Sequence, residues 1–129
     1  MDGKTEQLTA AEWNVMECLW ASPQPLTGGE AARLLAARVG WSRTTVLTML
    51  RRMEKKGLVE CDDGGKKLTF RPVLERSKAV RRETESFLSR VYRGSVGELM
   101  HCITQTETLS DAELDALYAI LDAAKERRT

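Results

Sequence analysis

Apolar residues recur every three or four positions between Ser42 and Lys56, which is the spacing of an amphipathic helix. This spacing places four apolar side chains on one stripe: Val46, Met49, Leu50 and Met53. The opposite side carries polar and basic residues: Thr44, Thr48, Arg51, Arg52 and Lys55. Ser42 is a typical N-cap, and Gly57 stands where a left-handed residue ends a helix. The pattern predicts a helix with one face for packing and another face free to contact a partner.

Two short strands are expected directly after this helix. Leu58–Cys61 and Leu68–Pro72 flank a glycine-centred turn at residues 62–67, which includes Lys66 and Lys67, so the segment is typical of a hairpin. We expect a third short strand at Pro25–Thr27, paired with the hairpin.

Two further helices precede this segment, and each starts with a capping box. Thr9 with Glu12 starts the first helix, and Thr27 with Glu30 starts the second. The residues expected to face inward are Trp13, Met16, Leu19 and Trp20 in the first helix and Ala31, Leu34, Leu35 and Val39 in the second. We interpret the three tryptophans, Trp13, Trp20 and Trp41, as core or turn anchors rather than as surfaces that stack on bases. Three helices followed by a hairpin predict a winged helix-turn-helix domain over residues 1–75.

Residues 76–129 have helical spacing and no strand signal, so the whole chain is expected to be mainly α with a small antiparallel β wing. Helices are expected at Ser77–Tyr92, at Ser95–Ile103 and from Ser110 onward. Capping boxes are expected where Ser95 precedes Glu98 and where Ser110 precedes Glu113.

These tail helices total too few residues to bury their apolar stripes alone. A second copy of the chain is the expected partner, and residues 76–129 are therefore predicted to form a helical dimerisation domain. The predicted dimer seam consists of Phe87, Leu88, Val91, Leu114, Leu117, Tyr118 and Leu121. A two-fold dimer would present two recognition helices about 34 Å apart to a palindromic site. The alternative is that the tail folds back onto its own winged domain.

The formal net charge is only +1, but the charges are unevenly distributed. Residues 43–71 hold eight basic and four acidic side chains, whereas residues 1–42 have an acidic excess. Neutralising phosphates requires a basic face rather than a basic protein. We therefore predict that the chain binds double-stranded DNA through these residues: Ser42, Arg43, Thr44, Thr45, Thr48, Arg51, Arg52, Lys55, Lys66 and Lys67.

The predicted roles follow from the chemistry of the side chains. Thr44, Thr45 and Thr48 are expected to meet base edges, while the arginines and lysines hold phosphates and Ser42 adds a further phosphate contact. The alternative is a protein-interaction module in which the same face docks an acidic protein. Salt-sensitive binding to duplex DNA would distinguish the two functions.

An enzyme is not predicted, because the chain has one histidine and neither a phosphate-binding glycine loop nor a nucleophile motif. Cys18, Cys61 and Cys102 are odd in number and widely spaced, which fits free thiols in a reducing compartment. His101 beside Cys102 is at most half of a metal site, so neither a metal nor a cofactor is predicted. The chain lacks a run of about 18 apolar residues, and Met1–Gln7 lack a hydrophobic signal segment, so we expect a cytoplasmic protein.

The run TTVLTMLRRMEKKGLV, from Thr44 to Val59, resembles the signature of the penicillinase-repressor (BlaI/MecI/CopY) family of winged-helix bacterial transcriptional repressors. Residues of the first helix are also similar to that family: Leu8, Thr9, Ala11, Glu12, Trp13, Val15, Met16, Leu19 and Trp20. The tail adds a weaker similarity at Phe87, Leu88 and Leu99, so the resemblance spans nearly the whole chain. The family places basic residues where this chain has Thr44 and Leu47, so a different operator sequence is expected.

The resemblance implies a homodimeric repressor that leaves a palindromic operator when a signal arrives. In the β-lactam-responsive members a membrane-bound sensor protease controls cleavage of an Asn-Phe peptide, which aligns here with Cys102 and Ile103. Copper-responsive members carry paired CxC motifs near the C-terminus, and Ala123–Thr129 contain none. The implied role is regulation of antibiotic-resistance or cell-envelope genes, and the alternative within the family is another inducing signal, such as a metal.

Overall fold

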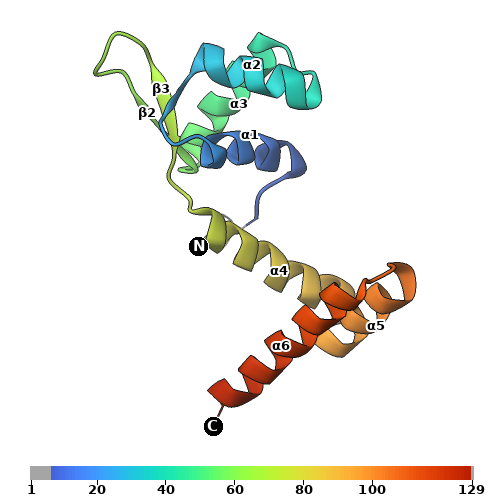
Figure 1. Ribbon diagram of the computed structural model, residues 1–129. Coiled ribbons are helices and arrows are strands. Elements are labelled where there is room, and N and C mark those ends of the chain that lie inside the picture. Colours follow the sequence, from blue (N-terminus) through green and yellow to red (C-terminus); the bar gives the residue numbers. More distant parts are fainter. Residues whose placement is uncertain (1–6, 129) are drawn as a thin grey trace. The chain divides into compact units, whose positions relative to one another are not determined.

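The computed structural model describes residues 7–128, and in this range it contains six helices and three strands (Figure 1). In chain order these are α1 (Ala10–Ala21), β1 (Leu26–Thr27), α2 (Gly28–Val39), α3 (Arg43–Lys55), β2 (Val59–Asp62), β3 (Thr69–Pro72), α4 (Arg76–Tyr92), α5 (Val96–Thr106) and α6 (Asp111–Arg127). Most of the N-terminal segment that we expected to lack a signal sequence lies outside the described residues. The expected class, mainly α with a small antiparallel sheet, is confirmed.

Capping boxes begin the first two helices, as predicted. The Thr9 hydroxyl accepts from the Glu12 amide at 3.1 Å, and the Thr9 amide donates to Glu12 Oε1 at 2.9 Å. The same pair of bonds joins Thr27 and Glu30, at 3.1 and 2.9 Å. Each box supplies hydrogen-bond acceptors for two backbone amides that have no partner within the helix. The local sequence therefore determines where α1 and α2 begin.

Left-handed glycines frame α3. Gly40 has φ +72° at the C-cap of α2, and Gly57 has φ +82° after the end of α3. Both backbone conformations strain residues that have a Cβ. The short turn after Gly40 leads through Trp41 to Ser42, which caps α3. Helices α2 and α3 therefore form the helix-turn-helix pair that the sequence predicts.

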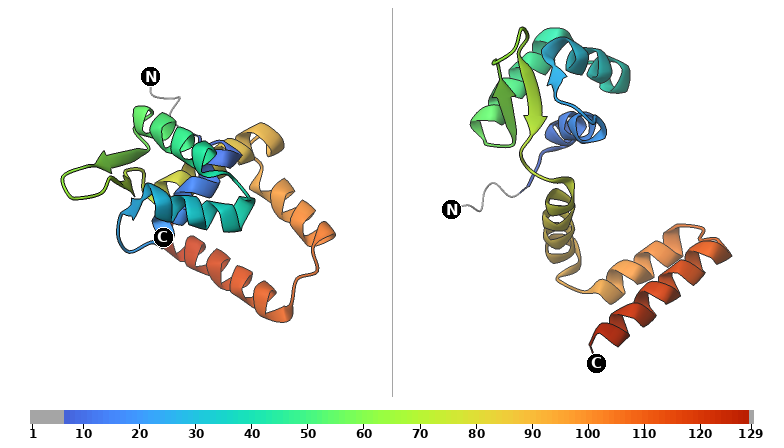
Figure 2. Two further views of the ribbon diagram at one scale, coloured as in Figure 1. Left: turned by 90° about the horizontal axis from the view of Figure 1, so that it is seen from above. Right: turned by 60° about the vertical axis from the view of Figure 1, so that its left-hand side comes forward.

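The sheet has the strand order β1-β3-β2, with antiparallel pairing throughout. Phe70 in the central strand pairs with Leu26 of β1 on one side and Cys61 of β2 on the other. The predicted pairing of the first strand with the hairpin is thus confirmed. The turn between β2 and β3 extends beyond the helices of its unit in the left view of Figure 2 and forms the wing.

One core joins α1, α2, α3 and the sheet. Its largest fully buried side chains are Val15, Met16, Leu35, Val46, Leu50, Met53 and Phe70. Two predictions for α2 are wrong, because Leu34 and Val39 are 44% and 37% exposed. The buried side of this helix instead contains Ala31, Ala32 and Leu35. Small alanines allow α2 to approach its neighbours closely, and this packing turns Leu34 toward solvent.

The described chain divides into two compact units, one ending at Ser86 and the other beginning at Phe87. The division lies within α4, whereas the boundary predicted from the sequence pattern falls before Arg76. The first turns of α4 belong to the winged unit because Ala79 is buried in its core. Arg76 also bonds to Glu17 of α1, with its Nε 3.2 Å from Oε1 and its Nη2 3.3 Å from Oε2.

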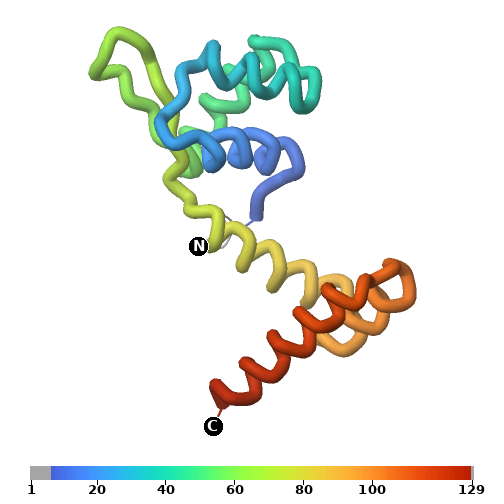
Figure 3. Tube along the Cα trace, viewed as in Figure 1, coloured from blue at the N-terminus to red at the C-terminus, as the bar shows by residue number. Residues whose placement is uncertain are grey.

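The second unit contains the end of α4 together with α5 and α6. Arg93 and Gly94 have φ values of +52° and +86° and end α4, as predicted. The chain then reverses direction between α5 and α6, as the trace in Figure 3 shows. The predicted capping box at Ser110 is present, but at Ser95 only half of the box forms, in which Ser95 Oγ accepts from the Glu98 amide at 3.0 Å. Neither α5 nor α6 has a buried residue.

The cysteines and the hydropathy of the helices bear on two of the sequence predictions. Cys18, Cys61 and Cys102 are all free thiols, as predicted. In the part of the chain that the structure describes, none of the helices is both long enough and apolar enough to span a membrane.

Candidate nucleic-acid interface

Helix α3 separates a buried side from an exposed side. Val46, Leu50 and Met53 are fully buried, and Met49 is nearly so. The residues predicted on the other side are all exposed: Thr44, Thr48, Arg51, Arg52 and Lys55. The predicted division of this helix into a packing face and an open face is therefore confirmed.

Ser42 and Thr45 form the cap of this helix. Ser42 Oγ accepts from the Thr45 amide at 3.2 Å, and its hydroxyl donates to Thr45 Oγ1 at 3.1 Å. Both side chains were predicted to contact DNA, and both are exposed. Their mutual hydrogen bond means that a contact with DNA would have to use the remaining hydrogen-bonding capacity of the two hydroxyls.

The arginines of α3 already have neighbours inside the protein. Arg51 Nη1 lies 3.2 Å from Glu54 Oε1 and 3.8 Å from Cys61 Sγ, and its guanidinium carbon is 5.9 Å from the centre of the Phe70 ring. Arg52 makes a weak contact with the sulfur of Met49 at 4.0 Å. Contacts with β2 and β3 thus hold the Arg51 side chain between α3 and the wing.

Three of the predicted cations have no such partner. Arg43, Lys55 and Lys66 form neither a hydrogen bond nor an ion pair with any residue that the structure describes. All three are exposed. An exposed cation without an internal partner retains its charge for a polyanion, and its cost of desolvation on binding is low.

The wing is shaped by its own polar contacts. Asp62 Oδ1 accepts from the Gly64 amide at 2.8 Å, and Glu60 pairs with Arg71 across the two strands. The carboxylates of Asp62 and Glu60 therefore already have partners within the wing. Lys66 and Lys67 are exposed in the turn, and their contact with phosphates stays a prediction.

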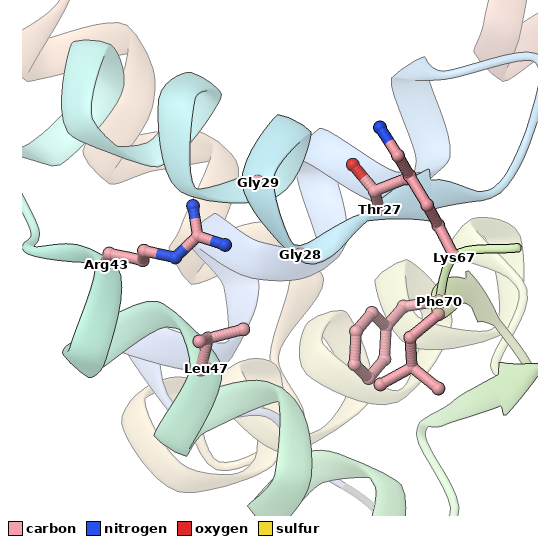
Figure 4. A pocket seen from close by; sticks show the side chains of 8 residues that line it. Thr27, Gly28, Gly29, Arg43, Leu47, Lys67 and Phe70 are labelled. Carbon is pink, nitrogen blue, oxygen red and sulfur yellow. The ribbon is translucent and has the colours of Figure 1, made fainter. Parts of the chain in front are cut away.

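A cavity of about 480 Å³ lies where α2, α3 and the wing meet. We call it the wing pocket, and it is lined by Thr27, Gly28, Gly29, Arg43, Leu47, Lys67, Leu68 and Phe70. Figure 4 shows Arg43 reaching toward the first turn of α2, with Lys67 on the opposite side of the pocket. Two predicted DNA-binding cations from different elements therefore converge here, beside a helix N-terminus that favours negative charge.

The electrostatics of this region include one acidic group. A hydrogen bond from the Thr27 backbone lowers the pKa of Glu30, and the nearby charges of Arg33 and Lys67 lower it further. Glu30 therefore stays ionised and partly offsets the charge of Lys67. Its exposed position means that solvent screens this effect.

Two contributors to this surface, Leu47 and Gly28, are not among the predicted DNA-binding residues. Leu47 is half-buried and lines the wing pocket, whereas the predicted DNA-binding residues near it in the sequence are all polar or basic. Gly28 lies so close to α3 that an added Cβ would be 2.9 Å from Leu47 Cδ2. Helical periodicity places Leu47 at the edge of the exposed side of α3, and this position was the sequence signal that could have identified it.

The remaining predicted positions lie in the second unit. Cys102 and Ile103 are in α5, where Cys102 is exposed and Ile103 half-buried. A hydrogen bond with the Cys102 side chain raises the pKa of Tyr92. Within the described residues, groups of three or more His, Cys, Asp or Glu side chains that could hold a metal are absent.

Comparison with known proteins identifies relatives of similar length. The family model named penicillinase repressor matches residues 8–123. The penicillinase repressor of Bacillus licheniformis is 30% identical over 125 residues, which cover 97% of each chain. The methicillin resistance regulatory protein MecI of Mammaliicoccus sciuri is 28% identical over 122 residues, covering 95% of this chain and 98% of that protein.

A solved structure supports the same relationship for the winged unit. The solution structure of the DNA-binding domain of the repressor BlaI is 28% identical and superimposes with a TM-score of 0.51. The match covers 57% of this chain and 89% of that domain. The family model matches nearly the full length of the chain, and two relatives are similar over almost their whole length. The chain therefore belongs to the penicillinase repressor family.

Proposed function

We propose that this chain is a DNA-binding transcriptional repressor that acts as a homodimer on a palindromic operator. The observation that carries the proposal is the open side of α3, where exposed threonines and cations lie opposite a fully buried stripe. A related repressor, BlaI, has a DNA-binding domain of this fold. An enzymatic role gains no support from relatives that are named as repressors or resistance regulators.

In this proposal Thr44, Thr45 and Thr48 contact bases, because short side chains near the start of α3 let its backbone approach base edges. Phosphates are held by basic residues of α3 and the wing: Arg43, Arg51, Arg52, Lys55, Lys66 and Lys67. Ser42 adds a phosphate contact at the N-terminus of α3. The wing pocket supports this assignment, because Arg43 and Lys67 converge there from two elements.

The second unit is proposed to form the dimer. Val91, Tyr118 and Leu121 are 50%, 68% and 60% exposed, and α5 and α6 bury no residue in a single chain. The proposed seam is the predicted one: Phe87, Leu88, Val91, Leu114, Leu117, Tyr118 and Leu121. Apolar helix faces of this kind gain stability when a second copy covers them. The boundary predicted from the change of hairpin to helical pattern, with residues 1–75 for DNA and 76–129 for the dimer, stays a proposal.

Regulation is proposed by analogy with the relatives. Two of them are named for penicillinase and methicillin resistance, so antibiotic resistance or cell-envelope genes are the proposed targets. A membrane-bound sensor protease would then control removal of the repressor, with Cys102–Ile103 as the cleavage region. Because Ile103 is half-buried within α5, cleavage there requires that this helix unfold locally.

The experiment measures affinity for a duplex that the protein itself selects from a random DNA pool. Arg52→Ala should weaken binding to all duplexes alike and lower the salt slope by about one unit, whereas Thr48→Ala should change sequence preference. Arg127→Ala, an exposed arginine near the end of α6, is the matched control and should change neither. Unchanged binding for both test variants would exclude this face. Binding to an acidic protein without salt-sensitive binding to random duplex DNA would favour an interaction module instead.

A further inference from the structure

Leu47 is an apolar side chain on the open, largely basic side of α3. Thr44 and Arg51 are neighbours of Leu47 on the surface of the helix, and Thr48 follows it in the sequence. All three are exposed. Leu47 itself is only half-buried, so part of its surface remains available. Leucine is apolar and uncharged, so at this position it neither makes the helix surface more soluble nor neutralises a phosphate.

Leu47 stands between two hollows in the surface. It lines the wing pocket, and it also lines a groove of about 460 Å³ on the outer side of α3 with Thr48, Arg51, Arg52 and Lys55. Arg43 and Lys67 lie on one side of it, and the other basic residues of α3 lie on the other side. Leu47 therefore lies between the two groups of cations to which the proposed function assigns phosphate contacts.

The Leu47 side chain is also held in place. Its Cδ2 atom is 2.9 Å from the position that a Cβ on Gly28 would occupy, so it packs against the first residue of α2. Figure 4 shows the side chain directed into the pocket between α2 and Phe70. A side chain that is fixed before binding loses little rotamer freedom when it contacts DNA.

A leucine cannot donate or accept a hydrogen bond, so it can discriminate bases only by apolar contact. In the major groove the 5-methyl group of thymine is the apolar feature that distinguishes one base pair from the others. On the basis of the proposed function, we infer that Leu47 is a specificity-determining residue that selects thymine at one position of each half-site through this methyl group.

The test replaces single thymines by deoxyuridine, which removes only the methyl group. The duplex is one that the wild-type protein selects from a random pool, and its thymines are exchanged one at a time. Wild-type protein should bind about four-fold more weakly when the contacted thymine is changed, as expected for one buried methyl-sized group. With Leu47→Ala, the same exchange should change affinity by less than about 1.5-fold, because the contact is already absent.

Each ratio compares two duplexes with one protein, so a change in protein stability cancels. Leu34→Ala, which shortens an exposed leucine of α2 outside the proposed DNA-binding residues, is the control and should retain the four-fold penalty at that thymine. The inference is overturned if the selected site has no thymine, if no exchange weakens wild-type binding, or if Leu47→Ala retains the penalty. Strong salt-sensitive binding with any of these results leaves the DNA-binding function intact, whereas a failure to bind any duplex overturns both.

Discussion

At the residue scale, Glu12 links the start of α1 to the end of α3. Its side chain is only 3% exposed, and Oε2 lies 2.5 Å from Lys56 Nζ while Oε1 accepts from the Thr9 amide. Lys56 is the C-cap of α3. A buried carboxylate needs such partners, because burial of an unpaired charge is costly. The pair therefore fixes the end of α3 relative to α1.

We expect Glu12→Ala to lower the free energy of unfolding by about 2–3 kcal/mol, since it removes both a cap and a largely buried ion pair. Glu30→Ala is the matched control, because Glu30 occupies the same position in the second capping box but is exposed. This control should cost about 1 kcal/mol or less. Urea unfolding at one protein concentration measures both, and equal losses would contradict the role given to Lys56.

Arg51 provides a second prediction at this scale. Its ion pair with Glu54 is exposed, with side chains 57% and 38% accessible, so breaking it costs little stability. Glu54→Gln should free Arg51 and remove a negative charge beside the proposed phosphate contacts, so DNA affinity should rise about two- to five-fold at low salt. Fluorescence anisotropy with a labelled duplex measures this change. Glu107→Gln, in the second unit, should have no effect, and a loss of affinity for Glu54→Gln would contradict the assignment.

At the element scale, the end of α3 depends on backbone conformation rather than on packing. Gly57 has φ +82°, and a Cβ there would have no atom within 4 Å. Gly57→Ala should therefore cost about 1–2 kcal/mol through backbone strain alone. Gly65→Ala is the control, because that site in the wing is equally open but does not have a positive φ. Thermal unfolding should find the control within about 0.5 kcal/mol of wild type, and a neutral Gly57→Ala would contradict this explanation.

The elements that sequence predicted well are those encoded by neighbours in the chain. The boxes at Thr9, Thr27 and Ser110, and the glycine after α3, lie within a few residues of the groups that they satisfy. Leu34 was misassigned because its environment depends on how α2 packs against other helices. Periodicity locates the faces of a helix, but it cannot decide how much of each face a neighbour covers.

The candidate nucleic-acid interface could likewise be predicted from sequence only in part. The exposed side of α3 follows from periodicity in one segment, so its residues could be predicted. The wing pocket combines Gly28, Arg43 and Lys67 from three elements, and only the folded chain brings them together. The partnership of Glu12 with Lys56, which are 44 residues apart, was hidden for the same reason.

At the scale of the whole molecule, α4 is anchored to the winged unit at its start. The Trp20 indole donates to the Leu74 carbonyl at 2.9 Å, and the Arg76 guanidinium lies 6.0 Å from the centre of the Trp20 ring. Arg76 also pairs with Glu17. These contacts hold the first turn of α4 against α1, so the winged unit determines how this helix begins.

The proposed dimer gives a direct prediction for the second unit. Leu117→Asp would place a charge in the apolar seam of α6, so the protein should become monomeric and lose affinity for a palindromic duplex about 100-fold or more. Ala119→Asp adds the same charge on the other side of α6 and should remain dimeric. Analytical ultracentrifugation measures the mass of each variant. The fluorescence of Trp13, Trp20 and Trp41, all in the first unit, reports whether that unit stays folded.

A Leu117→Asp protein that still sediments as a dimer would remove the seam from α6. A monomer that keeps full affinity for the palindromic duplex would instead show that dimerisation does not contribute to binding.

The central claim is that the open side of α3 and the turn of the wing contact duplex DNA. The most direct measurement is a titration of isotope-labelled protein with the selected duplex, followed by the chemical shifts of backbone amides. The account predicts that the largest changes fall on Ser42–Lys55 and on the wing around Lys66 and Lys67, and that high salt reverses them. Changes confined to α5 and α6, or no change with any duplex, would contradict it.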